Sequence, residues 1–98
     1  MKKEYCIMPD NKPIWRNFRY SDRCHRHEVF YGVRNRQKSI DDGLVVFLPP
    51  ELHNTSSLGV HYNKALDLEL KQAAQKRWCE YYDKTTEEFI KRYGRSYL

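Results

Sequence analysis

The side chains best suited to chemistry in this sequence are four histidines and a glutamate in two short stretches. Two histidines and the glutamate lie within "HRHEVFYG", and the other two histidines lie within "LPPELHNTSSLGVHYN". Imidazole and carboxylate groups bind divalent metal ions, and a metal site with one open coordination position can activate water. The sequence therefore raises one candidate metal site, against the alternative of unrelated surface residues. Its members are His25, His27, Glu28, His53 and His61.

Two short strands are expected to position the first of these residues. "HEVFYG" predicts a strand over residues 27–32 that ends at Gly32, and the apolar run "LVVFL" predicts a second strand over residues 44–48. The two prolines that follow stop this second strand. Between the strands, "VRNRQKSIDDG" predicts a polar loop that ends at Gly43.

Helical patterns dominate the second half of the chain. "PPELHN" predicts one helical turn, because proline is tolerated at the first position of a helix. Apolar residues at helical spacing predict a long helix from residue 61 or 62 to residue 82. Thr85 is the expected N-cap of a second helix, with Glu88 at the capping-box position. This helix should run to about Tyr93, where Gly94 stops it.

A strand–strand–helix unit of this kind would bring the candidate metal ligands together. His53 comes just past the second predicted strand, and His61 opens the long helix. Successive residues of a strand face opposite sides, so His27 and Glu28 cannot both face the same way. One of them can bind metal while the other points toward a substrate.

Length and composition limit the class of protein. Ninety-eight residues allow one domain with one modest core. The mean hydropathy is −0.93, no apolar run is long enough to span a membrane, and no signal peptide is recognisable. We therefore expect a cytoplasmic protein without a membrane partner. The three cysteines show no CxxC spacing, which favours reduced thiols over a disulfide framework.

The positive charge is concentrated between Lys12 and Lys38. This stretch holds eight Lys and Arg residues against two acidic residues, and aromatic residues are interleaved among them. Each contact between such a cation and a phosphate releases condensed counterions, so the pattern suits a nucleic-acid backbone. The alternative is a solvated face of a basic protein.

Seven motifs follow one another over residues 24–98: "RHEVFYG", "NRQKS", "GLVVFL", "ELHN", "GVHYN", "DLELKQAAQKRW" and "FIKRYGRSYL". In this order they resemble a small phage-encoded branch of the HNH endonuclease superfamily. The resemblance implies an α+β fold, the ββα-metal core, with a long helix and a short C-terminal helix. We expect one domain over residues 1–98, made of an irregular segment 1–22, a core 24–82 and a helix 85–93. The implied activity is cleavage of DNA phosphodiester bonds with one divalent ion, Mg²⁺ or Mn²⁺ before Ni²⁺ or Zn²⁺, in phage recombination or packaging.

The resemblance also assigns roles to residues, with two alignments open on the first strand. In one alignment His27 is a metal ligand and Glu28 the general base; in the other His27 is the base and His25 assists. Asn54 either orients His53 or caps the following segment. The assigned residues are, as catalytic, His27, Glu28 and Asn54; as metal ligands, His27, His53 and His61; and as nucleic-acid contacts, Arg34, Arg36 and Lys38. For Arg36 the alternative is a structural salt bridge to Asp41 or Asp42.

One departure from the family concerns its structural zinc, which many HNH proteins bind through two paired Cys or Cys/His sets. Here Cys6 has no CxxC partner, and the second pair is replaced by Pro49 and Leu52. We therefore expect no structural zinc, with apolar packing in its place from Ile7, Pro9, Trp15, Pro49 and Leu52. The same loss keeps a second function open, an inactive DNA-binding or nuclease-inhibiting protein with a phage or host partner. The sequence does not indicate which residues would pair across a dimer interface, so it predicts no oligomeric state.

Overall fold

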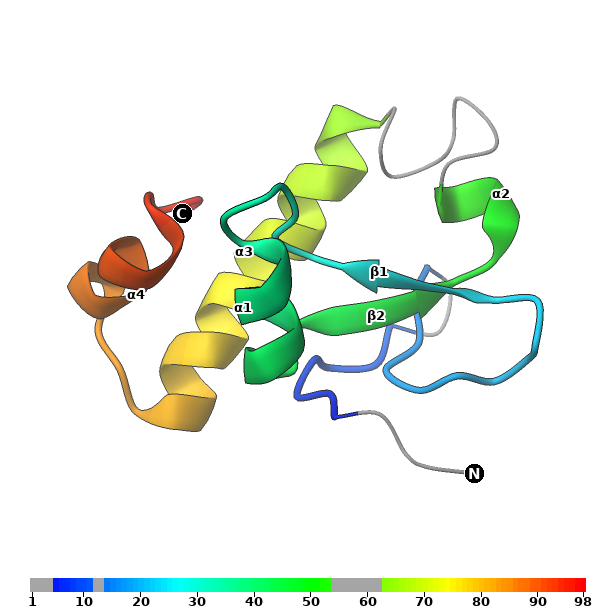
Figure 1. Cartoon of the computed structure of the whole chain (residues 1–98), viewed down its shortest axis with the longest axis horizontal. Coiled ribbons are helices and arrows are strands. Elements are labelled where there is room, and N and C mark those ends of the chain that lie inside the picture. The colour runs from blue at the N-terminus through cyan, green and yellow to red at the C-terminus, as the bar shows by residue number, and fades with distance from the viewer. Residues whose placement is uncertain (1–4, 12–13, 54–62) are drawn as a thin grey trace.

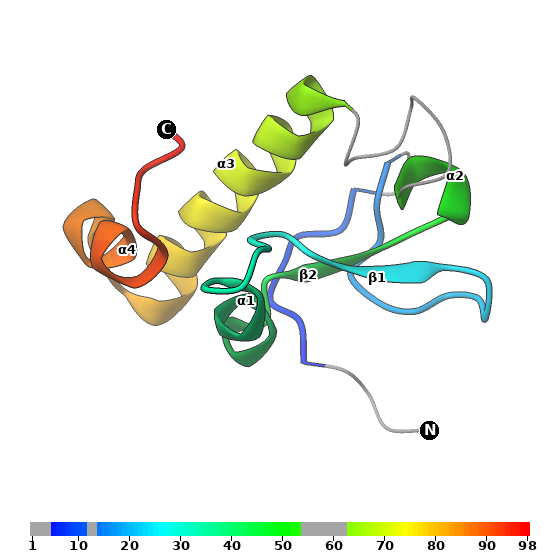
Figure 2. The same ribbon diagram turned by 45° about the horizontal axis from the view of Figure 1, so that its top comes forward.

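The computed structural model describes residues 5–11, 14–53 and 63–98 (Figure 1). The elements, in chain order, are β1 His25–Glu28, α1 Arg36–Asp42, β2 Val45–Leu48, α2 Pro50–His53, α3 Lys64–Tyr82 and α4 Thr86–Tyr93. The architecture is α+β, as the sequence predicts: a two-stranded antiparallel sheet, one long helix and a short C-terminal helix. In both views α4 lies beside the C-terminal half of α3 (Figure 1, Figure 2). None of the helices that the structure describes is long and apolar enough to cross a membrane.

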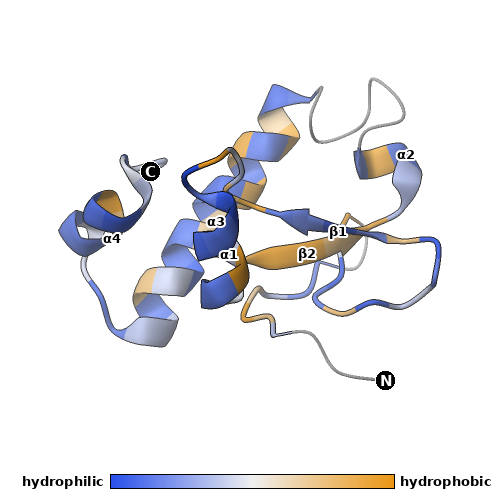
Figure 3. Ribbon diagram, in the orientation of Figure 1, coloured by the Kyte–Doolittle hydropathy of each residue, from blue (hydrophilic) through white to orange (hydrophobic). Residues whose placement is uncertain are grey.

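The two strands pair with His25 opposite Leu48 and Glu28 opposite Val45. β1 therefore begins two residues earlier than predicted and ends at Glu28 rather than near Gly32. The reason is a change of partner. Val29 N still donates to Leu44 O at 3.0 Å, but Phe30 N donates to the side chain of Ser39 at 2.9 Å, so the chain leaves the sheet there. β2 is uniformly apolar and β1 is hydrophilic (Figure 3), which makes β1 the strand that can carry a polar site.

The predicted polar loop between the strands is wrong for residues 36–42, which form helix α1. The residues that α1 buries are Ser39 and Asp42, both polar, so its sequence lacks the apolar period that identifies a helix. Gly43 closes α1 in the left-handed region, at φ 78°. A Cβ on Gly43 would lie 3.0 Å from Tyr5 Cε2 and 3.1 Å from Ile7 N, so the close approach of the N-terminal segment also requires glycine.

The helices begin and end where local capping signals place them, with one shift. α3 starts at Lys64 after an Asn63 cap, whose side chain accepts from Leu66 N at 3.1 Å, rather than at residue 61 or 62. α4 is confirmed: Thr85 and Glu88 form the capping box, and Gly94 ends the helix. α2 is the predicted single turn.

The N-terminal segment packs against β2 and contributes to the core. Arg16 and Phe47 exchange two backbone hydrogen bonds, of 3.1 and 2.9 Å, and so extend the sheet by one bridge. Ile7 and Trp15 are buried, as the expected apolar packing requires, and Leu52 packs against the core cluster to which they belong. Pro9 does not follow the expectation, since it is exposed; its carbonyl accepts a hydrogen bond from Trp15 Nε1 at 2.9 Å. The remaining core joins the sheet to α3 and α4 through Phe30, Leu70, Trp78, Phe89 and Tyr93.

Candidate active site

A pocket of ≈ 610 Å³ lies beside β1 and receives side chains from β1, α1 and α2. The hydrophilic strand supplies three consecutive residues, α1 supplies one exposed face, and α2 supplies its last residue. The lining residues are Arg26, His27, Glu28, Tyr31, Gly32, Val33, Arg36, Gln37, Ile40 and His53. The pocket therefore gathers several of the residues that the sequence singled out, from segments more than twenty positions apart.

Three histidines meet at this place. His25 and His27 alternate on β1, and His53 ends α2. The Nδ1 atoms of His25 and His53 are 3.0 Å apart, and the ring centroids of His27 and His53 are 5.3 Å apart. His27 is only 2% exposed. The structure thus brings His27 and His53 together as the sequence predicts, and it gives His25 a direct contact with His53.

The nitrogen pair of His25 and His53 suits either a hydrogen bond or metal binding. As a hydrogen bond, one ring donates and the other accepts, according to their tautomers. Two adjacent ligands of one ion, each about 2.1 Å from it, would also lie about 3.0 Å apart at a right angle. Among residues 5–11, 14–53 and 63–98, no three His, Cys, Asp or Glu side chains are grouped to hold a metal. Asn54 and His61, the other predicted members, lie outside the described residues.

Glu28 is held between two arginines. It is 8% exposed, and its Oε1 accepts from Arg36 Nε at 2.7 Å while its Oε2 accepts from Arg26 Nε at 3.3 Å. Arg36 therefore does form an ion pair, but with Glu28 rather than with the predicted Asp41 or Asp42. Both carboxylate oxygens are engaged, so Glu28 orients the two guanidinium groups along the pocket.

His27 and Glu28 line the same pocket although they are neighbours on a strand. The sequence expectation was that only one of them could face the site. β1 lies at the edge of a sheet whose order is β1-β2 in the described part of the chain. A pocket beside an edge strand is accessible from both faces of that strand, so strict alternation does not exclude either residue.

Tyr31 forms a further wall of the pocket, which the sequence did not identify as part of the site. Its ring centroid lies 5.8 Å from that of His27, and its hydroxyl donates to Asp67 at 3.1 Å. Lys71 Nζ lies 4.6 Å from the centre of the Tyr31 ring. Burial, and after it the Asp67 carboxylate, raises the pKa of Tyr31, so the phenol stays a donor at neutral pH. The only sequence signal for it was its place among the interleaved aromatics.

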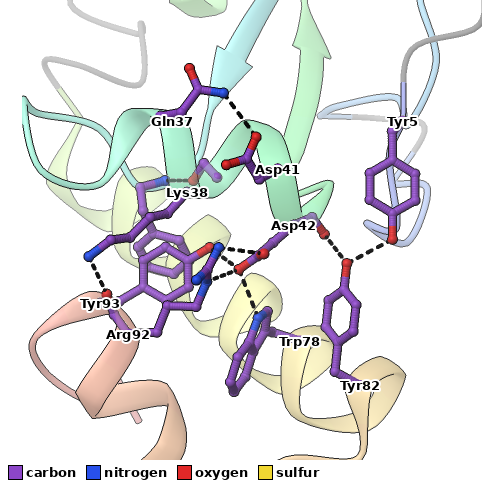
Figure 4. A network of polar contacts seen from close by, with 11 residues as sticks. Tyr5, Gln37, Lys38, Asp41, Asp42, Trp78, Tyr82, Arg92 and Tyr93 are labelled. Atoms are coloured by element: carbon purple, nitrogen blue, oxygen red, sulfur yellow. Dashed lines mark hydrogen bonds and ion pairs between the residues drawn. The ribbon is translucent and has the colours of Figure 1, made fainter.

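Two predicted nucleic-acid contacts lie outside the pocket lining. Arg34 is exposed in the turn before α1. Lys38 Nζ donates to Arg92 O at 2.8 Å and so ties α1 to the end of α4 (Figure 4). Lys38 is therefore engaged in a contact between helices on the side of α1 that faces α4.

The arrangement combines two chemical capacities. Clustered imidazoles can bind a divalent ion or exchange protons near neutral pH. Guanidinium groups of Arg26 and Arg36, held by one buried carboxylate, can recognise an anion such as a phosphate through their planar forks. Comparison of the chain with protein-family models, with curated proteins and with solved structures found no match.

Proposed function

We propose that this protein is a metal-dependent DNA endonuclease of the HNH type, with the pocket beside β1 as its active site. The observation that carries the proposal is the meeting of His27 and His53 in a pocket lined by two arginines, with His25 in contact with His53. In this proposal β1, β2 and α3 correspond to the ββα-metal core. The hydrophilic character of β1 supports it, because the strand buries His27 and Glu28 beside the pocket, and burying polar side chains costs free energy that an apolar strand would avoid.

The imidazole groups at the pocket are donors that suit a divalent ion, and because the described residues form no group of three, the proposal needs a ligand from elsewhere in the chain. His53 would hold the ion from the described side of the pocket, with His25 orienting its ring, and His61 is the further ligand proposed from the sequence. His27 is a ligand only in the alignment that makes Glu28 the base. When bound, Mg²⁺ or Mn²⁺ supplies positive charge that stabilises the charge developing on the phosphate and on the leaving 3′ oxygen. Zn²⁺ and Ni²⁺ are the alternatives that imidazole ligands also suit.

The contacts of Glu28 favour His27 as the general base. To accept a proton from water, Glu28 would have to give up one of its two ion pairs. His27 lines the same pocket and lies beside His53. We therefore assign proton abstraction to His27 and assign Glu28 to the positioning of Arg26 and Arg36. Arg36, with its side chain 67% exposed, would contact the scissile phosphate or its neighbour.

The second candidate function is an inactive protein of the same fold that binds DNA or inhibits a nuclease. The observation that favours it is the engagement of both Glu28 oxygens by arginine. Glu28 is the only carboxylate among the described residues that line the pocket. A site without an available acidic ligand is weaker toward hard ions such as Mg²⁺.

The experiment that separates the two functions is incubation of purified protein with supercoiled plasmid and Mg²⁺, Mn²⁺, Ni²⁺ or EDTA. We expect nicked or linear product with Mg²⁺ or Mn²⁺ and none with EDTA. Intact plasmid with every ion, together with retained binding of a labelled duplex, would contradict the endonuclease and support the inactive DNA-binding protein.

The proposal also predicts a steep dependence of DNA affinity on salt. On duplex DNA the logarithm of the binding constant should fall by roughly 0.9 per logarithm of salt for each phosphate neutralised. Arg34→Ala combined with Arg36→Ala should lower this slope by up to about two. Lys76→Ala combined with Lys84→Ala removes the same charge from exposed positions in and just after the C-terminal half of α3, outside the pocket lining, and should leave the slope unchanged. Equal effects of both pairs would mean that binding follows net charge rather than this surface.

A further inference from the structure

A second surface lies in the segment that precedes β1, and we call its side chains Arg16, Phe18, Arg19 and Tyr20 the Arg16–Tyr20 surface. Phe18 is 41% exposed and Tyr20 42% exposed. Their rings meet edge to face, with centroids 6.4 Å apart. The guanidinium of Arg16 lies 4.5 Å from the centre of Phe18 and 5.6 Å from that of Tyr20. Two partly exposed rings are thus held around one cation.

The Arg16–Tyr20 surface is fixed to the sheet. The backbone of Arg16 pairs with Phe47, and its side chain forms an ion pair with Asp10 at 3.2 Å. Arg19 Nη1 donates to Cys24 O at 2.9 Å, and its guanidinium lies 5.1 Å from the centre of the Phe47 ring. Side chains that are already held lose little conformational entropy when a ligand binds.

Arg16 of this surface lies on the same face of the sheet as Arg26, which lines the pocket beside β1. Phe47 is paired with Arg26 on one side and with Arg16 on the other. Directly opposite residues of antiparallel strands share a face, so Arg16, Phe47 and Arg26 lie on one face of the sheet. Two strand spacings, roughly 10 Å, therefore separate the backbone of Arg16 from that of Arg26. Arg26 in turn lines the pocket and contacts Glu28.

We propose that the Arg16–Tyr20 surface binds unpaired nucleotides, with bases stacked on Phe18 and Tyr20 and phosphates beside the arginines. In a duplex the faces of the bases are covered by their neighbours, so exposed rings can engage only bases that are unstacked. The charge fits this ligand, because residues 16–23 carry three arginines and one aspartate. The inference rests on the proposed function for its second part: the pocket acts on DNA that has a single-stranded segment beside the cleaved bond.

The test measures binding in EDTA, so that it does not depend on cleavage. The labelled ligands are a single strand of about 12 nucleotides and a duplex of the same length, which span the site size of small binding surfaces. Phe18→Leu combined with Tyr20→Leu keeps the apolar volume and removes the aromatic faces. We expect single-strand affinity to fall by about 10–100-fold, and duplex affinity to change less than about twofold. Phe18→Tyr, which keeps the ring, should bind as the wild type does.

The matched control is Tyr81→Leu. Tyr81 is 49% exposed on α3 and has the guanidinium of Arg77 5.2 Å from its ring centre, so it is the same type of pair at another place. It should leave both affinities unchanged. Unchanged single-strand affinity in the double leucine variant would overturn the proposal. So would an equal loss of single-strand affinity in Tyr81→Leu, or an equal loss of duplex affinity in the double leucine variant.

The outcomes separate this inference from the proposed function. Intact plasmid with ring-dependent binding would refute the endonuclease and leave the Arg16–Tyr20 surface standing. Metal-dependent cleavage with ring-independent binding would refute the surface alone. RNA offers the same base faces and phosphates, so an RNA strand is measured beside the DNA strand. An affinity for RNA more than tenfold above that for DNA, a difference of about 1.4 kcal/mol in binding free energy, would overturn the assignment of DNA as the ligand.

Discussion

Replacement of Asp42 by Asn should lower the free energy of unfolding by about 3 kcal/mol, the lower end of the range for breaking a buried ion pair. Asp42 is 9% exposed and accepts four hydrogen bonds (Figure 4). Trp78 Nε1 donates at 2.9 Å, the Tyr93 hydroxyl at 2.6 Å, and Arg92 through Nε and Nη2 at 2.5 and 2.8 Å. We take the lower end because the Arg92 side chain is 36% exposed, so water screens part of its loss.

The expected loss arises because an amide cannot replace this carboxylate. Asn would keep one acceptor oxygen and replace the other by an NH₂ group, which is itself a donor. That NH₂ group would face the donors of Trp78, Arg92 or Tyr93 and could not accept their hydrogen bonds. Burial, followed by the hydrogen bond to Asp42, raises the pKa of Tyr93, so its hydroxyl remains a donor at all working pH values. The Asp42 carboxylate thus joins α1 to α3 and α4. The backbone oxygen of Asp42 also accepts a hydrogen bond from the Tyr82 hydroxyl at 2.9 Å.

Urea unfolding followed by tryptophan fluorescence measures the effect. The neighbouring Asp41 provides the matched control, because its side chain is exposed and accepts a local hydrogen bond from Gln37, four residues earlier. Asp41→Asn should change the free energy of unfolding by less than about 0.5 kcal/mol. A loss below about 1 kcal/mol for Asp42→Asn would contradict the prediction. It would show that the four hydrogen bonds together stabilise the fold no more than one average hydrogen bond does.

Replacement of His27 by Ala should reduce metal-dependent cleavage by about 10²–10⁴, the usual contribution of a general base. If His27 is the base, the variant keeps its affinity for metal and loses turnover. If it is a ligand, metal affinity and activity fall together and added metal partly restores both. The ion pairs of Glu28 favour the first outcome. Calorimetric titration with metal, beside single-turnover cleavage, distinguishes the two.

Glu28→Gln completes the test. With His27 as the base, this substitution should act mainly through Arg26 and Arg36, lowering stability or phosphate binding rather than the chemical step. With Glu28 as the base, it would leave metal affinity nearly unchanged and cut the chemical step by about 10²–10⁴. Full activity of both variants would mean that β1 is structural and that the protein is not an endonuclease at this pocket.

The other histidines extend the series. His53→Ala and His61→Ala should each abolish metal-dependent cleavage with the fold intact, since both are proposed ligands. His25→Ala is the matched variant on the same strand face as His27. It should cost only about 10–100-fold, the usual effect of a residue that orients a metal ligand, because it acts through His53. Wild-type nicking by His53→Ala would remove α2 from the mechanism, and circular dichroism of each variant checks the fold.

The elements that depend on neighbours a few residues apart could be predicted from the sequence. The capping box of Thr85 and Glu88 lies within α4, and both groups that it satisfies are local. The β-branched run before Pro49 predicted β2 within one residue, and the same proline pair predicted α2. The polarity of the first strand and the placement of His53 after the second were likewise enough to predict that His27 and His53 meet.

Helix α1 and the partners of the charged residues could not be predicted in this way, because they depend on contacts between distant parts of the chain. α1 is stabilised by contacts that its own sequence does not contain: Ser39 bonds Phe30, and Asp42 bonds residues 36 to 51 positions away. Glu28 has four arginines within eight positions in the sequence, and it pairs with Arg26 and Arg36 because α1 folds back on β1. Lys38, expected on DNA, reaches Arg92 because α4 returns beside α1. Charged side chains carry no periodic signal, so their partners follow from which helices the apolar core brings together.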